Sequence, residues 1–106
     1  MVTELDAATF AETTAGGDVV VVDFWAPWCR PCLAFAPVFE AAAGEHPSVR
    51  FAKLNVEDHP QIATEMEVRS IPTLMVFANG ERVTERVGAI SAAALDDLVT
   101  SLTAPE

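Results

Sequence analysis

The strongest feature of the hydrophobic pattern is a run of apolar and β-branched residues over Val19–Trp25, which only Asp23 interrupts. The run has no 3.6-residue period, which is typical of a strand buried on both faces in a parallel sheet. Ala26 and Pro27 break the strand, and a helical pattern follows with Pro31 in its first turn, where the missing N–H is no loss. The chain is therefore expected to pass here from a buried strand into a helix N-terminus.

The rest of the pattern predicts alternating strands and helices. In chain order, the expected elements are a strand over Val2–Leu5, a helix over Ala7–Ala15, the strand over Val19–Trp25, a helix from the Cys29–Cys32 segment to about Glu45, a strand over Val49–Val56, a helix over Gln61–Met66, strands over Leu74–Ala78 and Arg82–Val87, and a helix from Ser91 to about Leu102. A helix between two strands favours a right-handed βαβ unit with a parallel pair. We therefore expect one α/β domain over residues 1–106, with a mixed sheet of about five strands flanked by about four helices.

Local signals add detail to these elements. Asp6, Asp58 and Ser91 are expected to cap helix N-termini. The dipeptide Asn79-Gly80 is a hairpin signal that makes the last two strands antiparallel. The helix residues expected to face the core are Ala7, Phe10 and Thr14 in the first helix, Phe35 and Phe39 in the second, and Ala94, Leu95, Leu98, Val99 and Leu102 in the last. Leu33, Val38 and Ala41–Ala43 add to the apolar character of the second helix.

Charge and composition limit the partners. The 106 residues include sixteen acidic and six basic side chains, giving a formal net charge of −10. This balance argues against binding to nucleic acid or to an anionic membrane surface. No apolar run reaches the roughly eighteen residues of a membrane-spanning helix. The first residues lack the features of a signal peptide, so we expect a cytoplasmic location. Two cysteines in a cytoplasmic chain are more often catalytic than structural.

The two cysteines form the motif Cys29-Arg30-Pro31-Cys32 at the predicted start of a helix. Cys29 is expected at the exposed helix N-terminus, where free N–H groups and the macrodipole favour a thiolate, so it is the expected nucleophile. Cys32 lies one turn further in. The alternatives are a structural disulfide, which would constrain only a very short loop, and half of a zinc site, which would need two further ligands. The only histidines, His46 and His59, fall at predicted helix boundaries, and we expect no metal site.

Three charged residues stand out. Asp23, within the apolar strand, indicates a strand end or a satisfied core polar group. Lys53, the only lysine, interrupts a strand expected beside that of Asp23 and is interpreted as a strand-end side chain that reaches solvent. Arg30 is either a solvated residue that adjusts docking or a cation that favours the Cys29 thiolate and makes the protein a weaker reductant.

The motifs together resemble the thioredoxin family, from about Phe10 to Leu102. The resemblance rests on Val22-Asp-Phe-Trp-Ala26, Trp28-Cys-Arg-Pro-Cys32, Ala36-Pro37, Ala52-Lys-Leu-Asn55, Ile71-Pro-Thr-Leu74, Asn79-Gly80 and Gly88-Ala89. Arg30-Pro31 replaces the usual Gly-Pro, and Leu33 replaces a common lysine. The residues of these motifs look most like those of the second bacterial thioredoxin branch, but the chain lacks the N-terminal zinc ribbon that this branch often carries.

The resemblance implies roles for these residues. Asp23 would lie buried beneath the cysteines, pair with Lys53 and assist proton transfer at Cys32. The Ile71–Pro72 bond would be cis, and the backbone of Ile71 would pair with an extended substrate. Trp25 is expected to pack beneath the site. The residues expected to contact substrates are Trp28, Arg30, Pro31, Val56, Ile71, Pro72, Gly88 and Ala89.

The implied function is a protein-disulfide reductase that works through a Cys29/Cys32 dithiol and a mixed disulfide. The resemblance implies a protein without a bound cofactor, which a flavin-containing thioredoxin reductase recharges with NADPH and which acts on disulfide-containing client proteins. The oligomeric state is open, and a monomer is the default expectation. Two alternatives stay open. One is a dedicated electron donor, or an oxidase or isomerase if the chain is exported. The other is a non-redox binding module of the same fold.

Overall fold

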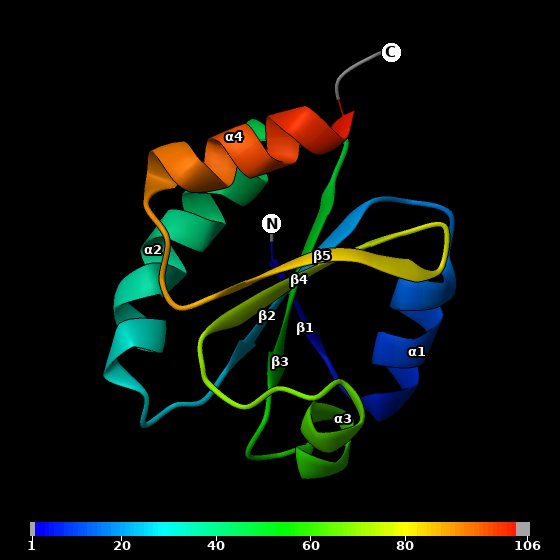
Figure 1. The fold of residues 1–106 in the computed structure, drawn as a ribbon, viewed down its shortest axis with the longest axis vertical. Helices are drawn as coiled ribbons and strands as arrows, with labels where there is room; N and C mark the ends of the chain where they lie inside the picture. Colours follow the sequence, from blue (N-terminus) through cyan, green and yellow to red (C-terminus); the bar gives the residue numbers. More distant parts are fainter. Residues whose placement is uncertain (1, 104–106) are drawn as a thin grey trace.

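The computed structural model describes residues 2–103, so residues 1 and 104–106 of the predicted domain lie outside the described part. In chain order the elements are β1 (Val2–Leu5), α1 (Ala7–Ala15), β2 (Val20–Trp25), α2 (Arg30–Glu45), β3 (Arg50–Asn55), α3 (Pro60–Glu65), β4 (Thr73–Ala78), β5 (Glu81–Val87) and α4 (Ala92–Thr103). The predicted β-α-β-α-β-α-β-β-α order is confirmed, with boundaries that move by a residue or two (Figure 1).

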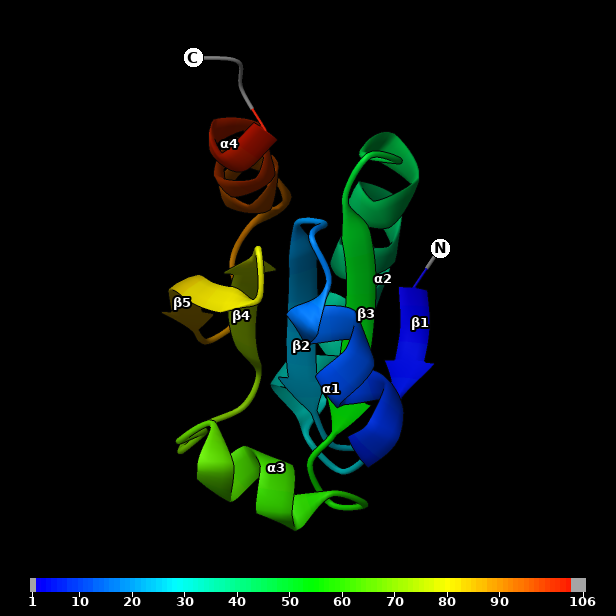
Figure 2. The ribbon, with the colours of Figure 1, turned by 90° about the vertical axis from the view of Figure 1, so that its right-hand side faces the viewer.

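The five strands form one mixed sheet in the order β1-β3-β2-β4-β5, with β1 and β5 at opposite edges (Figure 2). Strands β1, β3 and β2 are parallel, as the helical connections predicted, whereas β4 is antiparallel to β2 and β5 is antiparallel to β4. Strand β2 is therefore central. Its residues from Val20 to Phe24, which lead toward the cysteine motif, pair with β3 on one side and with β4 on the other.

Two apolar clusters separate the sheet from its helices. On one face, Val21 and its neighbours pack against Phe35 and Phe39 of α2 and Leu95 of α4. On the other face, the alternate residues of β2 pack against Phe10 of α1 and Ile62 of α3. Figure 1 shows α2 and α4 on one side of the sheet and α1 and α3 on the other. Because both faces are covered, β2 has the continuous apolar sequence of a central strand.

The side chain of Asp6 caps α1 as predicted, since it accepts a hydrogen bond from the Thr9 N–H at 2.9 Å while the Thr9 hydroxyl accepts one from the Asp6 N–H at 2.8 Å. This reciprocal pair is a capping box. Ser91 Oγ likewise accepts from the Ala94 N–H at the start of α4.

The prediction that Asp58 caps the third helix is wrong. The helix begins at Pro60 with His59 as the N-cap, so Asp58 lies one residue too early in the chain, and His59 makes no side-chain capping bond. The His59 carbonyl instead accepts from the Ile62 N–H at 3.2 Å.

Several predicted core residues face outward. Ala7 and Ala94 are exposed, and Thr14 is only half-buried while Thr13 is buried in its place. Leu33, which belongs to the apolar sequence of the second helix, is also 49% exposed. The reason is helical geometry: Cys32, Phe35 and Phe39 share the buried face of α2, and Leu33 is rotated by about 100° from Cys32.

The predicted Asn79-Gly80 hairpin is confirmed. Both residues have positive φ, +54° and +82° respectively, which a tight hairpin turn with the twist of the sheet requires. Glycine adopts this conformation without steric cost.

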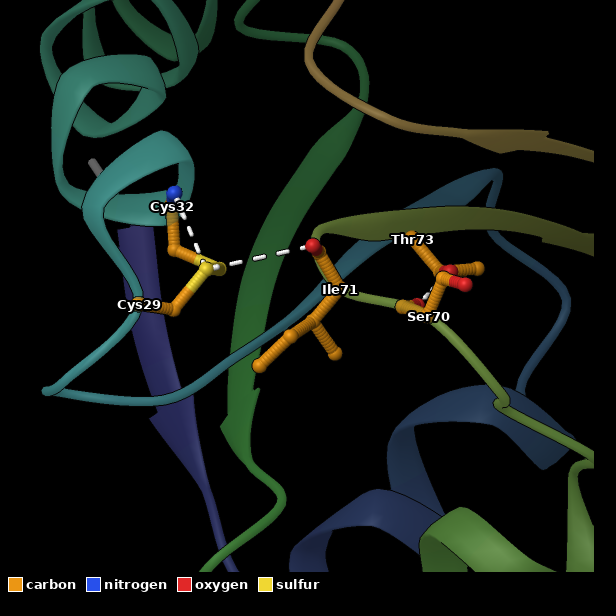
Figure 3. Close-up of a disulfide and its surroundings, with 5 residues drawn as sticks. All are labelled: Cys29, Cys32, Ser70, Ile71 and Thr73. Atoms are coloured by element: carbon orange, nitrogen blue, oxygen red, sulfur yellow. Dashed lines mark hydrogen bonds between the residues drawn. A yellow bond between two sulfur atoms is a disulfide. The ribbon is translucent and has the colours of Figure 1, made fainter.

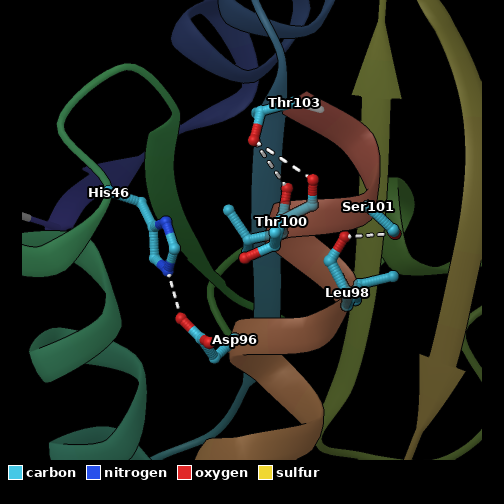
Figure 4. A network of polar contacts seen from close by, with 7 residues as sticks. His46, Asp96, Leu98, Thr100, Ser101 and Thr103 are labelled. Carbon is cyan, nitrogen blue, oxygen red and sulfur yellow. Dashed lines mark hydrogen bonds and ion pairs between the residues drawn. The ribbon is translucent and has the colours of Figure 1, made fainter. Parts of the chain in front are cut away.

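The C-terminal end of α2 is joined to α4 by a polar contact. His46, the C-cap of α2, lies with Nε2 2.8 Å from Oδ1 of Asp96 (Figure 4). Among the described residues, no helix is both long enough and apolar enough to cross a membrane.

Candidate active site

The cysteine motif is positioned by the junction between β2 and α2. A turn closes this junction, because the Cys29 N–H donates to the Ala26 carbonyl at 3.1 Å. Cys29 is the N-cap of α2, and its Sγ accepts a hydrogen bond from the Cys32 N–H at 3.3 Å. A sulfur in this position satisfies one of the free N–H groups of the helix and is stabilised by them when it carries a negative charge.

Cys29 and Cys32 form a disulfide, with their Cα atoms 5.2 Å apart. The prediction of an exposed Cys29 is wrong for the residue as a whole, since Cys29 is 6% exposed and Cys32 2%. The two cysteines are covered by Trp25, Val56 and Ile71, which come from three separate segments of the chain. The packing role predicted for Trp25 is confirmed.

A second segment approaches the disulfide at the start of β4. The Ile71–Pro72 peptide bond is cis, as the resemblance implied. Figure 3 shows the Ile71 carbonyl oxygen directed at the disulfide, with Cys29 Sγ at 3.8 Å. The Gly88 N–H donates to the Pro72 carbonyl at 2.8 Å, which brings the end of β5 to the same place. Segments far apart in sequence therefore meet at the cysteine pair.

The other predicted substrate-contact residues border this place. Trp28, in the loop before Cys29, is 67% exposed. Arg30 and Pro31 are exposed in the first turn of α2, and Ala89 is exposed next to Gly88. Leu33, which was not among the predicted contact residues, adds an exposed apolar side chain in the same turn of α2 as the cysteines. The helical period of the buried residues around it was the signal that would have found it.

Asp23 lies on β2 and is buried in the sheet, with 3% of its surface exposed. Its Oδ1 has no hydrogen-bond partner among residues 2–103. The pKa of the Asp23 carboxyl is raised from 3.8 to about 7, chiefly because the group is buried; the charge of Lys53 opposes this rise and that of Glu4 adds to it. The carboxyl is thus able to exchange a proton near neutral pH.

Within residues 2–103, Asp23 and Lys53 do not form the ion pair that the resemblance implied. Lys53 is the register partner of Asp23, but its Nζ lies 3.7 Å from Oε1 of Glu4 instead. Nζ also lies 4.8 Å from the centroid of the Trp25 ring. Glu4 was not predicted as a partner of Lys53, because its position beside Lys53 depends on the pairing of β1 with β3.

Within residues 2–103, no group of three or more His, Cys, Asp and Glu side chains is placed to hold a metal ion. The site therefore consists of a cysteine pair at a helix N-terminus, a neighbouring backbone carbonyl and a buried carboxyl.

Comparisons with known proteins agree with this geometry. The family model for thioredoxin matches residues 1–101. A thioredoxin from Porphyra purpurea is 44% identical over 97 residues, which cover 90% of this chain and 91% of that protein. A bifunctional thioredoxin reductase/thioredoxin from Mycobacterium leprae is 45% identical over 91 residues, which cover 85% of this chain and 20% of that protein.

The solved structure of a mutant thioredoxin from Halobacterium salinarum has a TM-score of 0.90 to this chain. The two sequences are 37% identical, and the match covers 99% of this chain and 93% of that one. The fold, the cysteine pair and these relatives agree. The chain therefore belongs to the thioredoxin family, and it is a thiol–disulfide oxidoreductase that carries its electrons in a cysteine pair without a bound cofactor.

Proposed function

We propose that Cys29 is the nucleophile with which this protein reduces disulfides in client proteins. The observation that carries the proposal is the position of Cys29 Sγ at the N-cap of α2, where it accepts the Cys32 N–H. In the dithiol form this position favours a thiolate at Cys29, because free N–H groups and the helix dipole stabilise the negative charge.

The reaction consists of two exchanges. The Cys29 thiolate attacks one sulfur of the client disulfide, a Cys29–client S–S bond forms, and the other client sulfur leaves as a thiolate that takes up a proton. Cys32 then loses its proton and attacks Cys29 Sγ. The Cys29–Cys32 bond forms, the mixed disulfide breaks, and the second client sulfur leaves. The client gains two electrons, and the protein is left in the disulfide state.

Asp23 is the proposed acceptor of the Cys32 proton, with Lys53 as a charge that acts on it. The proposal is supported by the burial of Asp23, by its Oδ1, which no group in residues 2–103 partners, and by a pKa raised to about 7. A carboxyl with this pKa accepts and returns a proton at neutral pH more readily than an ordinary aspartate.

An extended client segment is proposed to dock across the disulfide and to pair with the backbone of Ile71. The approach of the Ile71 carbonyl to Cys29 supports this placement (Figure 3). The residues proposed to contact clients are Trp28, Arg30, Pro31, Val56, Ile71, Pro72, Gly88 and Ala89.

Thioredoxin reductase is the proposed electron donor, and NADPH is used only by that enzyme. The relative from Mycobacterium leprae, which is named a bifunctional thioredoxin reductase/thioredoxin, supports this partner. A monomeric state, a cytoplasmic location and a place in the second bacterial branch stay predictions.

The test is NADPH consumption in the presence of a thioredoxin reductase and a disulfide-bonded protein substrate. We expect turnover with this protein and none above background with Cys29→Ser, because a serine hydroxyl does not form the thiolate that the first exchange requires. If turnover appears only when a chemical dithiol replaces the reductase, the proposed donor is wrong. Equal turnover by the variant would rule out Cys29 as the nucleophile.

Arg30 provides a separate prediction about the reduction potential. Arg30 is the first residue of α2, directly after Cys29, and is exposed. A cation there stabilises the thiolate and hence the reduced form. We expect Arg30→Gly to make the potential more negative by on the order of 20 mV, the size of an exposed charge interaction. Equilibration with a glutathione buffer measures the change, and Arg30→Lys, which keeps the charge, is the control. An unaltered or less negative potential in Arg30→Gly would contradict the prediction.

A further inference from the structure

Three side chains of alternating charge lie in one row across the sheet. The strand register pairs Glu4 of β1 with Lys53 of β3, and Lys53 with Asp23 of β2. Residues that are register partners project from the same face of a sheet. Lys53 thus lies between two carboxyl groups, one buried at 3% exposure and one at the edge of the sheet with half of its side chain exposed.

The contacts of Lys53 are on the Glu4 side of this row. Its Nζ lies 3.7 Å from Glu4 Oε1 and 4.8 Å from the centroid of the Trp25 ring. The other carboxylate oxygen of Glu4, Oε2, accepts a hydrogen bond from Trp25 Nε1 at 3.4 Å. Glu4 is therefore held at one end by the indole and holds the ammonium at the other. In the described part of the chain, the buried Oδ1 of Asp23 has no hydrogen-bond partner.

We propose that Glu4 is a positioning residue for proton transfer at the cysteine pair, because its carboxylate engages the Lys53 ammonium that would otherwise pair with Asp23. The inference rests on the proposed role of Asp23 as the proton acceptor of Cys32. Glu4 acts through Lys53 and touches neither the cysteines nor the client.

The physical reason is the competition between two carboxylates for one cation. An ammonium group in direct contact with a buried carboxylate favours its ionised form and lowers its pKa. Engagement of Lys53 by Glu4 weakens this effect on Asp23, and the negative charge of Glu4 acts in the same direction. Of the charged groups in residues 2–103, Lys53 and Glu4 are the two that shift the pKa of Asp23. Its partner on β4, Leu74, is apolar, and the cysteines carry no charge in the disulfide form.

The test is the titration of the Asp23 carboxyl carbon by 13C NMR in the disulfide form of the protein, in which the cysteines do not titrate. Glu4→Gln removes the charge but retains an oxygen that can accept from Trp25. We expect it to lower the pKa of Asp23 by about half a pH unit, the size expected for partly exposed charges. Glu85→Gln is the matched control, because Glu85 is exposed on β5 at the opposite edge of the sheet. We expect this control to leave Asp23 unchanged.

A second pair of variants tests the route through Lys53. In a Lys53→Met background, Glu4→Gln is expected to lower the pKa of Asp23 by much less than in the wild type. A shift of the same size in both backgrounds would overturn the proposal, because Glu4 would then act on Asp23 directly. No shift in Glu4→Gln beyond that of Glu85→Gln would also overturn it. Near-ultraviolet circular dichroism of each variant verifies that the tertiary packing is kept.

The kinetic readout separates this inference from the function on which it rests. In rapid-mixing measurements of the second exchange, Glu4→Gln is expected to move the acidic limb of the pH–rate profile to lower pH by the same half unit. If Asp23→Asn leaves that profile unaltered, Asp23 is not the proton acceptor, and the proposed role fails even where the NMR shift is found. If Asp23→Asn abolishes the limb while Glu4→Gln leaves it in place, the role of Asp23 holds and the inference about Glu4 is overturned.

Discussion

A Cys32→Ser variant is expected to stop after the first exchange and to accumulate one mixed disulfide per chain. Cys29 is the N-cap of α2 with the Cys32 N–H directed at its sulfur, and that backbone N–H is retained in the variant. The thiolate of Cys29 therefore still attacks a disulfide, but no second thiol is present to release the product. We expect turnover to fall by on the order of 10³-fold or more, since a whole step of nucleophilic catalysis is lost.

Mass spectrometry of the intact protein, after reaction of the reduced variant with a small aromatic disulfide, measures the adduct. One equivalent of aromatic thiol is expected to be released in a single burst. Cys29→Ser is the matched control, because it keeps a cysteine at the more buried position, which is 2% exposed. Little or no adduct is expected with it in the same time. A faster adduct at Cys32 than at Cys29 would reverse the proposed order of the two exchanges.

The parts of the fold that were predictable from sequence depend on local signals. The apolar run that becomes β2, the Asn79-Gly80 turn, and the Asp6 and Ser91 caps each specify a conformation within a few residues. The error at Asp58 shows the limit of this approach. To predict a capping residue, the first residue of the helix must be known without error. Pro60 is compatible with more than one helix start, so its presence alone does not identify the cap.

The parts of the site that were not predictable depend on contacts between segments far apart in the chain. The resemblance implied that Val56 and Ile71 lie near Cys29, but no local pattern predicts that these two loops bury it. The sequence correctly predicted that β3 lies beside β2, and so that Lys53 is near Asp23. It did not predict which carboxylate Lys53 would contact.

The answer to that question is set by the order of strands in the sheet. Strand β1 pairs with β3 at the edge, which provides Lys53 with a half-exposed partner, Glu4. An ion pair in contact with water costs less desolvation than one with a buried carboxylate. Lys53 pairs with Glu4, so that both charges stay in contact with water. The buried Asp23 carboxyl instead keeps its proton up to about pH 7.

Asp23→Ala is expected to make the disulfide form of the protein more stable at pH 8. The unfolded chain releases this proton near the ordinary pKa of 3.8, whereas the folded protein holds it until about pH 7. Between these values the folded state binds more protons, so the free energy of unfolding falls as the pH rises. The cost of ionising Asp23 in the folded state begins near pH 4, is complete above pH 7, and amounts to about 4 kcal/mol.

Removal of the carboxyl abolishes this cost, although the small cavity left in its place costs about 1 kcal/mol. The net gain of about 3 kcal/mol at pH 8 corresponds to a rise in the melting temperature on the order of 10 °C for a domain of this size. Calorimetry at about pH 8 and about pH 3 measures it. At the lower pH, where Asp23 is largely protonated in both states, the variant is expected to be no more stable than the wild type.

A gain of equal size at both pH values would show that the effect comes from packing and that Asp23 is not buried as a costly charge. A loss of stability at pH 8 would mean that the folded protein supplies Asp23 with a partner that compensates its charge. In that case Asp23 would be a structural residue, because a well-compensated carboxylate would keep a low pKa and would not accept the Cys32 proton near neutral pH.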